Sequence, residues 1–223
     1  MMINSFEDYL RSIGSDPEII FDPNPSPAKH QRYGHNYGII QRGVQLSIET
    51  ENATKKDGLW LEFGVYSGIT INSIARIAKH KEIFGFDSFL GLPEVWRGMP
   101  TSVFDRNGVT PDVELNVTLV SGWFNQTIPK FLDEKCKDSD FISFLHIDCD
   151  IYSSTIEVFN NFHDKIKKGT VILFDELYNY PEWKDHEFKA LTELSSNYNK
   201  NFDVIAYAGS SSASNQQALI QIL

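Results

Sequence analysis

One stretch decides the fold: Leu59-Trp60-Leu61-Glu62-Phe63-Gly64-Val65-Tyr66-Ser67-Gly68. Its first half is apolar enough for a short buried strand, and Gly64 and Gly68 then turn the chain into a helix that we expect to begin near Ile69. Both glycines suit a turn that needs positive φ, or one at which a ligand lies against bare backbone. A strand, a glycine turn and a helix N-terminus are typical of a doubly wound α/β domain, where such a turn lines a crevice for a nucleotide-like ligand.

The details of this turn argue against a dinucleotide. The glycine spacing is G-x-x-x-G, so the G-x-G-x-x-G pattern that places a pyrophosphate on the helix N-terminus is incomplete. Glu62 closes the strand, where it would repel a phosphate and attract an ammonium group. A ligand with an adenosine end and a cationic amino-acid end fits better, which points to S-adenosylmethionine lying along Tyr66 and Ser67. The alternative is an ordinary strand–turn–helix without a ligand.

The rest of the chain alternates between strands and helices. Strands are predicted at 83–86, 117–120, 141–147 and 170–174, with helices at 69–80, 124–136, 154–167 and 183–198. Two further strands, at 202–208 and 218–223, form a closing hairpin. This order predicts a mainly parallel sheet with helices on both faces and an antiparallel C-terminal hairpin. We divide the chain into a helical extension or lid at 1–52 and one domain at 53–223.

Composition excludes several functional classes. The 223 residues suit one domain with a full core, since 41% of them are hydrophobic. A net charge of −10 disfavours nucleic acid and anionic membranes, which both require clustered Lys and Arg. We find no signal peptide and no apolar run of the ~18 residues that a membrane span needs. The sequence therefore predicts a cytoplasmic protein with a small-molecule partner.

Several of the predicted strands end in an acidic residue or are followed by one. In open α/β sheets ligands bind at the carboxyl ends of the strands, so these acids are the main candidates for function. Asp87 follows Glu62 by 25 residues, near the spacing at which an acid meets the ribose hydroxyls of a bound nucleotide. Ser88 would flank that ribose. The alternative for Asp87 and Ser88 is a helix cap. Gly122 and Trp123 close the next strand, where the indole could cover an adenine or pack in the core.

Three more acids, Asp148, Asp175 and Glu176, follow the strands at 141–147 and 170–174. Neighbouring carboxylates would repel one another unless a cation or a proton joined them, and oxygen ligands suit Mg²⁺, Ca²⁺ or Mn²⁺. The alternative is a set of solvated acids and caps. His146 lies two residues before Asp148 and shares its side of the strand, so it is a candidate base or a structural histidine. Asp150 is an alternative ligand, and it would point the same way as Asp148 only if the strand continued past its expected end.

Several blocks resemble class I S-adenosylmethionine-dependent methyltransferases, and more specifically the macrocin and mycinamicin O-methyltransferase family, which methylates sugars of macrolide antibiotics. The blocks are residues 61–68 quoted above, Gly85-Phe86-Asp87-Ser88-Phe89-Leu90-Gly91-Leu92-Pro93-Glu94, Leu145-His146-Ile147-Asp148-Cys149-Asp150-Ile151-Tyr152-Ser153-Ser154-Thr155, and the Asp175-Glu176 step. The resemblance implies a Rossmann-like sheet of seven strands, methyl transfer to a hydroxyl, and Mg²⁺ held by Asp148, Asp175 and Glu176.

The sequence departs from this family at two positions. Relatives end the fifth strand in two aspartates, whereas the second acid here is Glu176. The macrolide enzymes also use a histidine base from the loop after the second strand, and residues 88–115 contain no histidine. We therefore expect Asp148 to be the main catalytic residue, with His146 as a supporting base.

The function expected from the sequence is O-methylation of a sugar or natural product. The alternatives are an NAD-dependent oxidoreductase and a catalytically silent cofactor-binding protein of the same fold. A homodimer with the N-terminal segments at its interface is left open.

Overall fold

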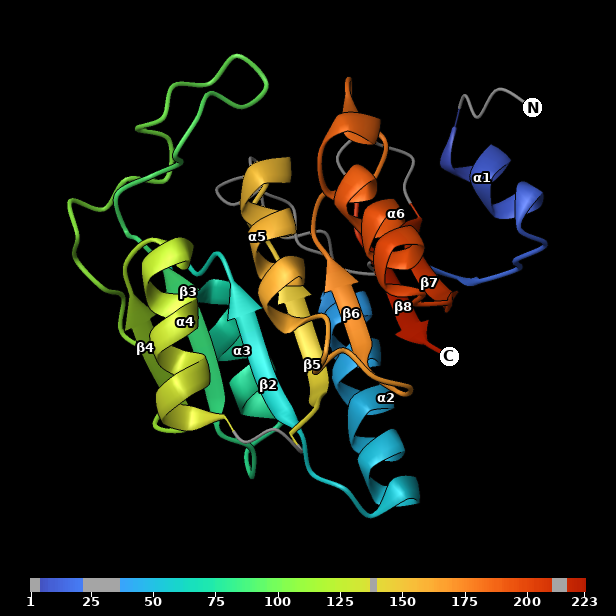
Figure 1. The fold of residues 1–223 in the computed structure, drawn as a ribbon, viewed down its shortest axis with the longest axis horizontal. Coiled ribbons are helices and arrows are strands. Elements are labelled where there is room, and N and C mark those ends of the chain that lie inside the picture. Colours follow the sequence, from blue (N-terminus) through green and yellow to red (C-terminus); the bar gives the residue numbers. More distant parts are fainter. Residues whose placement is uncertain (1–4, 22–36, 137–139, 210–215) are drawn as a thin grey trace.

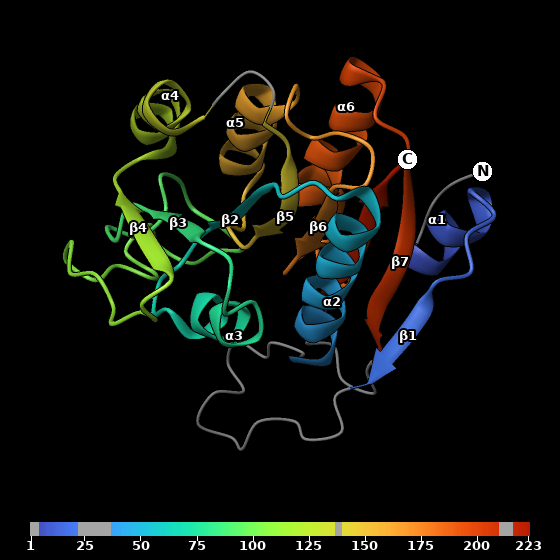
Figure 2. The same ribbon diagram turned by 90° about the horizontal axis from the view of Figure 1, so that it is seen from below.

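The computed structural model describes residues 5–21, 37–136, 140–209 and 216–223, which form one mixed sheet with helices on both faces (Figures 1 and 2). The helices are α1 (Phe6–Ser12), α2 (Tyr37–Thr54), α3 (Ile69–Ile77), α4 (Phe124–Lys135), α5 (Tyr152–Phe162), the 3-10 turn η2 (Trp183–Asp185) and α6 (Glu187–Tyr198). The strands are β1 (Glu18–Phe21), β2 (Leu59–Phe63), β3 (Ile83–Asp87), β4 (Val117–Ser121), β5 (Ile142–Ile147), β6 (Val171–Phe174), β7 (Phe202–Gly209) and β8 (Ala218–Ile222).

The strand order is β1-β7-β8-β6-β5-β2-β3-β4, and every pairing except those of β8 is parallel. The predicted parallel sheet with an antiparallel C-terminal hairpin is confirmed. From β2 the chain continues to β3 and β4 on one side and to β5 and β6 on the other, so β2 lies at the topological switch point. Phe63 is paired with Phe86 of β3 and with Ile147 of β5, which brings the carboxyl ends of these strands level. Ligands bind at this position in such sheets.

The expected count of seven strands was wrong, because the sheet has eight among the described residues. The additional strand β1 pairs in parallel with β7, with Glu18 opposite Ala206. It has four residues and lies at the sheet edge, too short to show a strand periodicity in the sequence. The helix expected at 154–167 ends at Phe162, because a turn through Gly169, at φ 93°, leads into β6.

Two hydrophobic cores lie against the two faces of the sheet. Figure 2 shows α4, α5 and α6 over one face and α2 and α3 over the other. The first core contains a stack of Phe63 on Phe86 at 4.5 Å, whereas Trp60 and Phe144 belong to the second core. Strands buried on both sides read as nearly continuous apolar runs, as the sequence of β5 does.

The N-terminal segment is joined to this architecture, since α2 contacts β5 and β6 and β1 extends the sheet. Its predicted role as a lid stays a prediction. Among the described residues, no helix combines the length and the apolar character needed to cross a bilayer.

Candidate active site

A cavity of about 940 Å³ lies at the carboxyl ends of β2, β3, β5 and β6. Nine of the residues predicted from the sequence line it: Gly64, Tyr66, Ser67, Asp87, Ser88, Trp123, Asp148, Asp175 and Glu176. The loops after five separate strands, these four and β4, thus converge on one space. Glu62, Gly68, Gly122 and His146 lie outside this lining, so any contact of theirs with a ligand stays a prediction.

The turn after β2 requires its glycines. Gly64 has φ 93°, and a Cβ placed on it would lie 1.7 Å from the carbonyl oxygen of Asp148. Gly68 has φ 78° and is the N-cap of α3. The expectation of positive φ at both positions is confirmed. Because Gly64 lies against the backbone after β5, the turn and the Asp148 segment are held together at the cavity wall.

Asp87 fixes the conformation of this turn. Its Oδ2 accepts the backbone N–H groups of Val65 at 2.8 Å and Tyr66 at 2.7 Å. Its Oδ1 accepts the N–H of Phe89 at 2.7 Å. One carboxylate therefore joins the loop after β2 to the loop after β3. It lines the cavity while doing so, and its predicted contact with a ribose stays a prediction.

Trp123 is the N-cap residue of α4 and lines the cavity beside Phe124. Gly122 precedes it at φ 136° and donates its backbone N–H to the carbonyl of Asp87 at 2.9 Å. Trp123 is partly buried, and part of it faces the cavity. This position is compatible with the predicted adenine contact.

Glu62 and His146 form a buried pair below the cavity. Both side chains are inaccessible to solvent, and Glu62 Oε2 lies 3.0 Å from His146 Nδ1. The other carboxylate oxygen of Glu62 accepts the hydroxyl of Thr70 at 2.9 Å. Glu62 was expected to meet an ammonium group, but in this structure both of its oxygens have partners inside the protein. His146, the expected supporting base, is likewise separated from the cavity.

The acids at the ends of β5 and β6 share one electrostatic environment. Burial, followed by repulsion from Asp175 and Glu176, raises the pKa of the Asp148 carboxyl well above its usual value. Burial and the charge of Asp175 raise the pKa of Asp150 and of Glu176 in the same way. These carboxyls therefore favour the protonated form or a bound cation.

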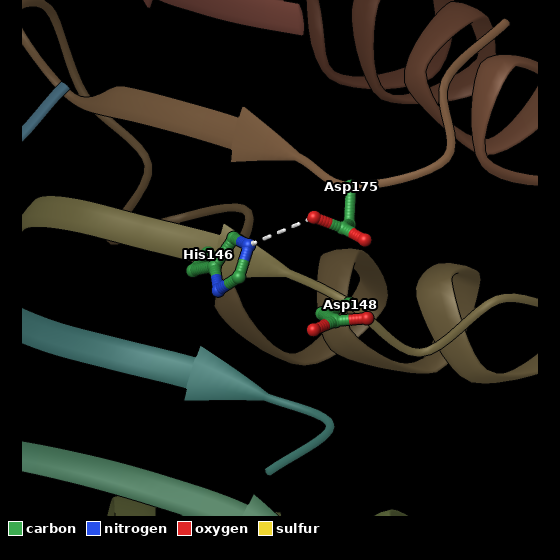
Figure 3. Close-up of side chains that lie close together, drawn as sticks. All are labelled: His146, Asp148 and Asp175. Atoms are coloured by element: carbon green, nitrogen blue, oxygen red, sulfur yellow. Dashed lines mark ion pairs between the residues drawn. The ribbon is translucent and has the colours of Figure 1, made fainter. Parts of the chain in front are cut away.

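Within this group the structure brings three ligand atoms together. One ligand atom each of His146, Asp148 and Asp175 lies within 4.8 Å of the others (Figure 3). Glu176 lines the same cavity but is not part of this trio, so its predicted role as a metal ligand stays a prediction. Gln217 Nε2 donates a hydrogen bond to Oδ1 of Asp175 and helps to orient that carboxylate.

Sequence reasoning missed one residue of this region, Glu187, and named Asp150 only as an alternative ligand. Glu187 is the first residue of α6 and is fully buried. Among the described residues, neither of its carboxylate oxygens has a hydrogen-bond partner within the usual distance and angle limits. Burial, then the charges of Asp150 and Asp175, raise its pKa well above the usual value. Asp150 was considered only if the strand continued. It lines the cavity because the chain turns at φ 65° after β5 ends.

The chain is similar to known proteins in sequence and in fold. Residues 61–177 match a family described as a methyltransferase domain. Among solved structures, the chain is similar to CalS11, a calicheamicin methyltransferase, at 22% identity and a TM-score of 0.60, over 81% of this chain and 77% of that one. It is also similar to the O-methyltransferase NovP, at 20% identity and a TM-score of 0.56, over 83% of this chain and 78% of that one. At these identities the likeness shows a shared fold. No curated protein matches the sequence.

Proposed function

The chain belongs to the methyltransferase domain family, and we propose that it transfers the methyl group of S-adenosylmethionine to a hydroxyl of a sugar or a sugar-bearing natural product. The observation that carries this proposal is the single cavity shared by the glycine turn and the acids of β5 and β6. Its volume of about 940 Å³ is large enough for a cofactor with a small acceptor beside it. The family assignment argues against the NAD-dependent alternative.

The sugar acceptor is supported by the structural relatives. Another structure of CalS11, at 22% identity and a TM-score of 0.56 over 84% of this chain and 80% of that one, is described as a TDP-rhamnose 3′-O-methyltransferase. A net charge of −10 also favours a small molecule over nucleic acid or an anionic membrane. A homodimer remains a proposal, which size-exclusion chromatography with light scattering would test.

The cofactor is expected to lie along the turn from Gly64 to Gly68. Its ribose would meet Asp87 and Ser88, and its adenine would lie beside Trp123. The three backbone hydrogen bonds of Asp87 hold the turn in shape before the ligand arrives. Such preorganisation reduces the conformational entropy that binding would otherwise cost. Glu62 contributes negative charge below the turn, which favours the ammonium end.

During transfer the methyl–sulfur bond breaks as the methyl–oxygen bond forms, and the hydroxyl proton must leave. Asp148 lines the cavity and is our candidate to hold the acceptor hydroxyl and take this proton. Its raised pKa makes it a better proton acceptor than an ordinary carboxylate once ionised. Alignment of the two reactants can itself contribute about 7–11 kcal/mol to lowering the barrier.

A divalent cation fits the donors at this site. Asp148, Asp175 and Glu176 present carboxylates to one cavity, and the raised pKa values of Asp148 and Glu176 indicate that uncompensated negative charge is unfavourable there. The family resemblance implies Mg²⁺. Such an ion, when bound, lowers the pKa of a coordinated hydroxyl.

The test has two stages. Calorimetry should detect binding of S-adenosylmethionine and none of NAD. A panel of free sugars, nucleotide-linked sugars and phenols is then screened for release of S-adenosylhomocysteine, with Asp148→Asn as the inactive control. Turnover on sugars supports the proposal, and turnover on phenols alone contradicts the sugar class. Cofactor binding without turnover on any acceptor would favour the silent binding protein, and failure to bind the cofactor would refute methyl transfer.

A further inference from the structure

His146 carries a nitrogen that no other part of the described chain satisfies. The ring is completely buried on β5, and its Nε2 has no hydrogen-bond partner among the described residues. Oδ1 of Asp175 lies 4.0 Å from this nitrogen, and Figure 3 shows the nitrogen directed toward that carboxylate. Buried polar atoms are nearly always partnered, so this nitrogen points to a missing ligand.

The opposite side of the ring explains why Nε2 carries a lone pair. Nδ1 lies 3.0 Å from Oε2 of Glu62, and a carboxylate can only accept at this contact. The hydroxyl of Thr70 holds the other oxygen of Glu62 in place at 2.9 Å. Glu62 therefore favours the tautomer with hydrogen on Nδ1, which leaves Nε2 as an acceptor facing Asp175. A carboxylate behind a histidine in this way is the usual second shell of a metal-bound imidazole.

The distances suit a single ion. Metal–nitrogen and metal–oxygen bonds are each about 2.0–2.2 Å, so one ion can bridge two atoms up to about 4.4 Å apart. His146 Nε2 and Asp175 Oδ1, at 4.0 Å, fall within that limit. Asp148 completes a trio whose ligand atoms all lie within 4.8 Å of one another, so a small movement of its carboxyl is enough to bring it to the same ion. Asp148 and Asp175 line the cavity, and His146 lies buried behind them.

We propose that His146 Nε2, Asp148 and Asp175 form a metal site, with Glu62 orienting the imidazole, and that this site prefers a first-row transition-metal ion to Mg²⁺. The inference deepens the proposed function, because the same cavity would hold the acceptor. Mg²⁺ favours oxygen ligands, whereas an imidazole nitrogen raises affinity for ions from Mn²⁺ onward. Glu176 then remains an acid of the cavity wall rather than a ligand.

The test uses Mn²⁺ and Mg²⁺ with the whole protein. We expect calorimetry to give at least tenfold tighter binding of Mn²⁺ than of Mg²⁺. Pulsed electron paramagnetic resonance of bound Mn²⁺ should show coupling to one histidine nitrogen. His146→Gln should abolish that coupling and weaken Mn²⁺ binding by about tenfold or more. Glu62→Gln should weaken Mn²⁺ binding by about 10–100-fold, whereas Glu176→Gln should change it by less than about threefold. His80→Gln, at an exposed position, is the matched control.

Several results would overturn the site. The proposal is wrong if bound Mn²⁺ shows no nitrogen coupling, if Mg²⁺ binds as tightly as Mn²⁺ or more tightly, or if neither metal binds. It is also wrong if Glu176→Gln loses Mn²⁺ binding while His146→Gln binds Mn²⁺ as the unaltered protein does. The coupling in the unaltered protein decides the question even if His146→Gln fails to fold. S-adenosylmethionine binding, measured on the same samples, separates the two proposals. Cofactor binding without nitrogen coupling refutes only this site, and coupling without cofactor binding refutes only the methyl transfer.

Discussion

Replacing Asp87 with alanine should damage both the stability of the protein and its cofactor site. Asp87 accepts three backbone N–H groups at 2.7–2.8 Å, two from the loop after β2 and one from the loop after β3. The alanine variant would leave all three donors without this acceptor. The amide of Tyr66 is exposed and can be rehydrated, whereas those of Val65 and Phe89 are partly buried. The cost should therefore come mainly from the two partly buried donors.

The magnitude follows from those two hydrogen bonds. A hydrogen bond to a charged group is worth about 1.5–3 kcal/mol, and we take the lower end for each because water can reach both loops. The loss of unfolding free energy is then about 3 kcal/mol, which lowers Tm by roughly 6–12 °C in a domain of this size. Loss of the ribose contact and of turn order should weaken S-adenosylmethionine binding by about one to two decades.

Differential scanning calorimetry measures the first effect, and isothermal titration with S-adenosylmethionine measures the second. Asp87→Asn retains one acceptor oxygen and should fall between the alanine variant and the unaltered protein. Asp112→Ala, at an exposed position, controls for the removal of one negative charge. If Asp87→Ala melts within about 2 °C of the unaltered protein and binds the cofactor equally well, our account of the turn is wrong.

Three further results are expected. Gly64→Ala should abolish cofactor binding and lower Tm, because its Cβ would lie 1.7 Å from the carbonyl oxygen of Asp148; normal calorimetric binding would contradict this. Burial raises the pKa of Glu187 in the folded protein above the value near 4.3 that it has in the unfolded chain. The folded state is therefore stabilised by the protonated carboxyl at low pH, and this stability is lost as the pH rises from about 4.3 toward the folded pKa. The Tm of the unaltered protein should thus fall more between about pH 5 and pH 8 than the Tm of Glu187→Gln. Glu49→Gln, at an exposed position, is the control and should behave like the unaltered protein. If Tm falls equally with pH in the unaltered protein and in Glu187→Gln, this role of Glu187 is wrong. Asp148→Asn should lower turnover by about 10²–10⁴-fold with little change in cofactor affinity. EDTA should reduce the activity of the unaltered protein. Activity that survives both changes would refute the catalytic role of Asp148 and of the cation.

The sequence was sufficient to predict the sheet, because its strands are buried on both faces. Strands such as β5 are nearly continuous apolar runs, and β3, β5 and β6 each end in an aspartate or are followed by one. The edge strand β1 was missed, since four residues paired on one side leave no periodic signal. Helix ends shifted by several residues where a turn, such as that at Gly169, decides the boundary.

The site was predictable where position in a strand determines position in space. Asp87, Asp148 and Asp175 lie at strand ends, so the parallel register alone brings them to one cavity. Asp150 and Glu187 could not be placed in this way. Asp150 depends on a backbone turn at φ 65°, and Glu187 on the packing of α6 against α5 and η2. Neither dependence leaves a pattern in the sequence around the residue.

The pairing of β1 with β7 constrains the order in which the protein can fold. Glu18 lies opposite Ala206, 188 positions later, and β7 reaches the rest of the sheet only through β8. A growing polypeptide therefore carries residues 18–21 without their partner until the segment 202–222 has been synthesised. Contacts this distant in sequence form late, because a long loop must close before they contribute. A chain interrupted before residue 202 would expose the unpaired edge of β6 together with an unattached β1, and such edges recruit other chains into aggregates.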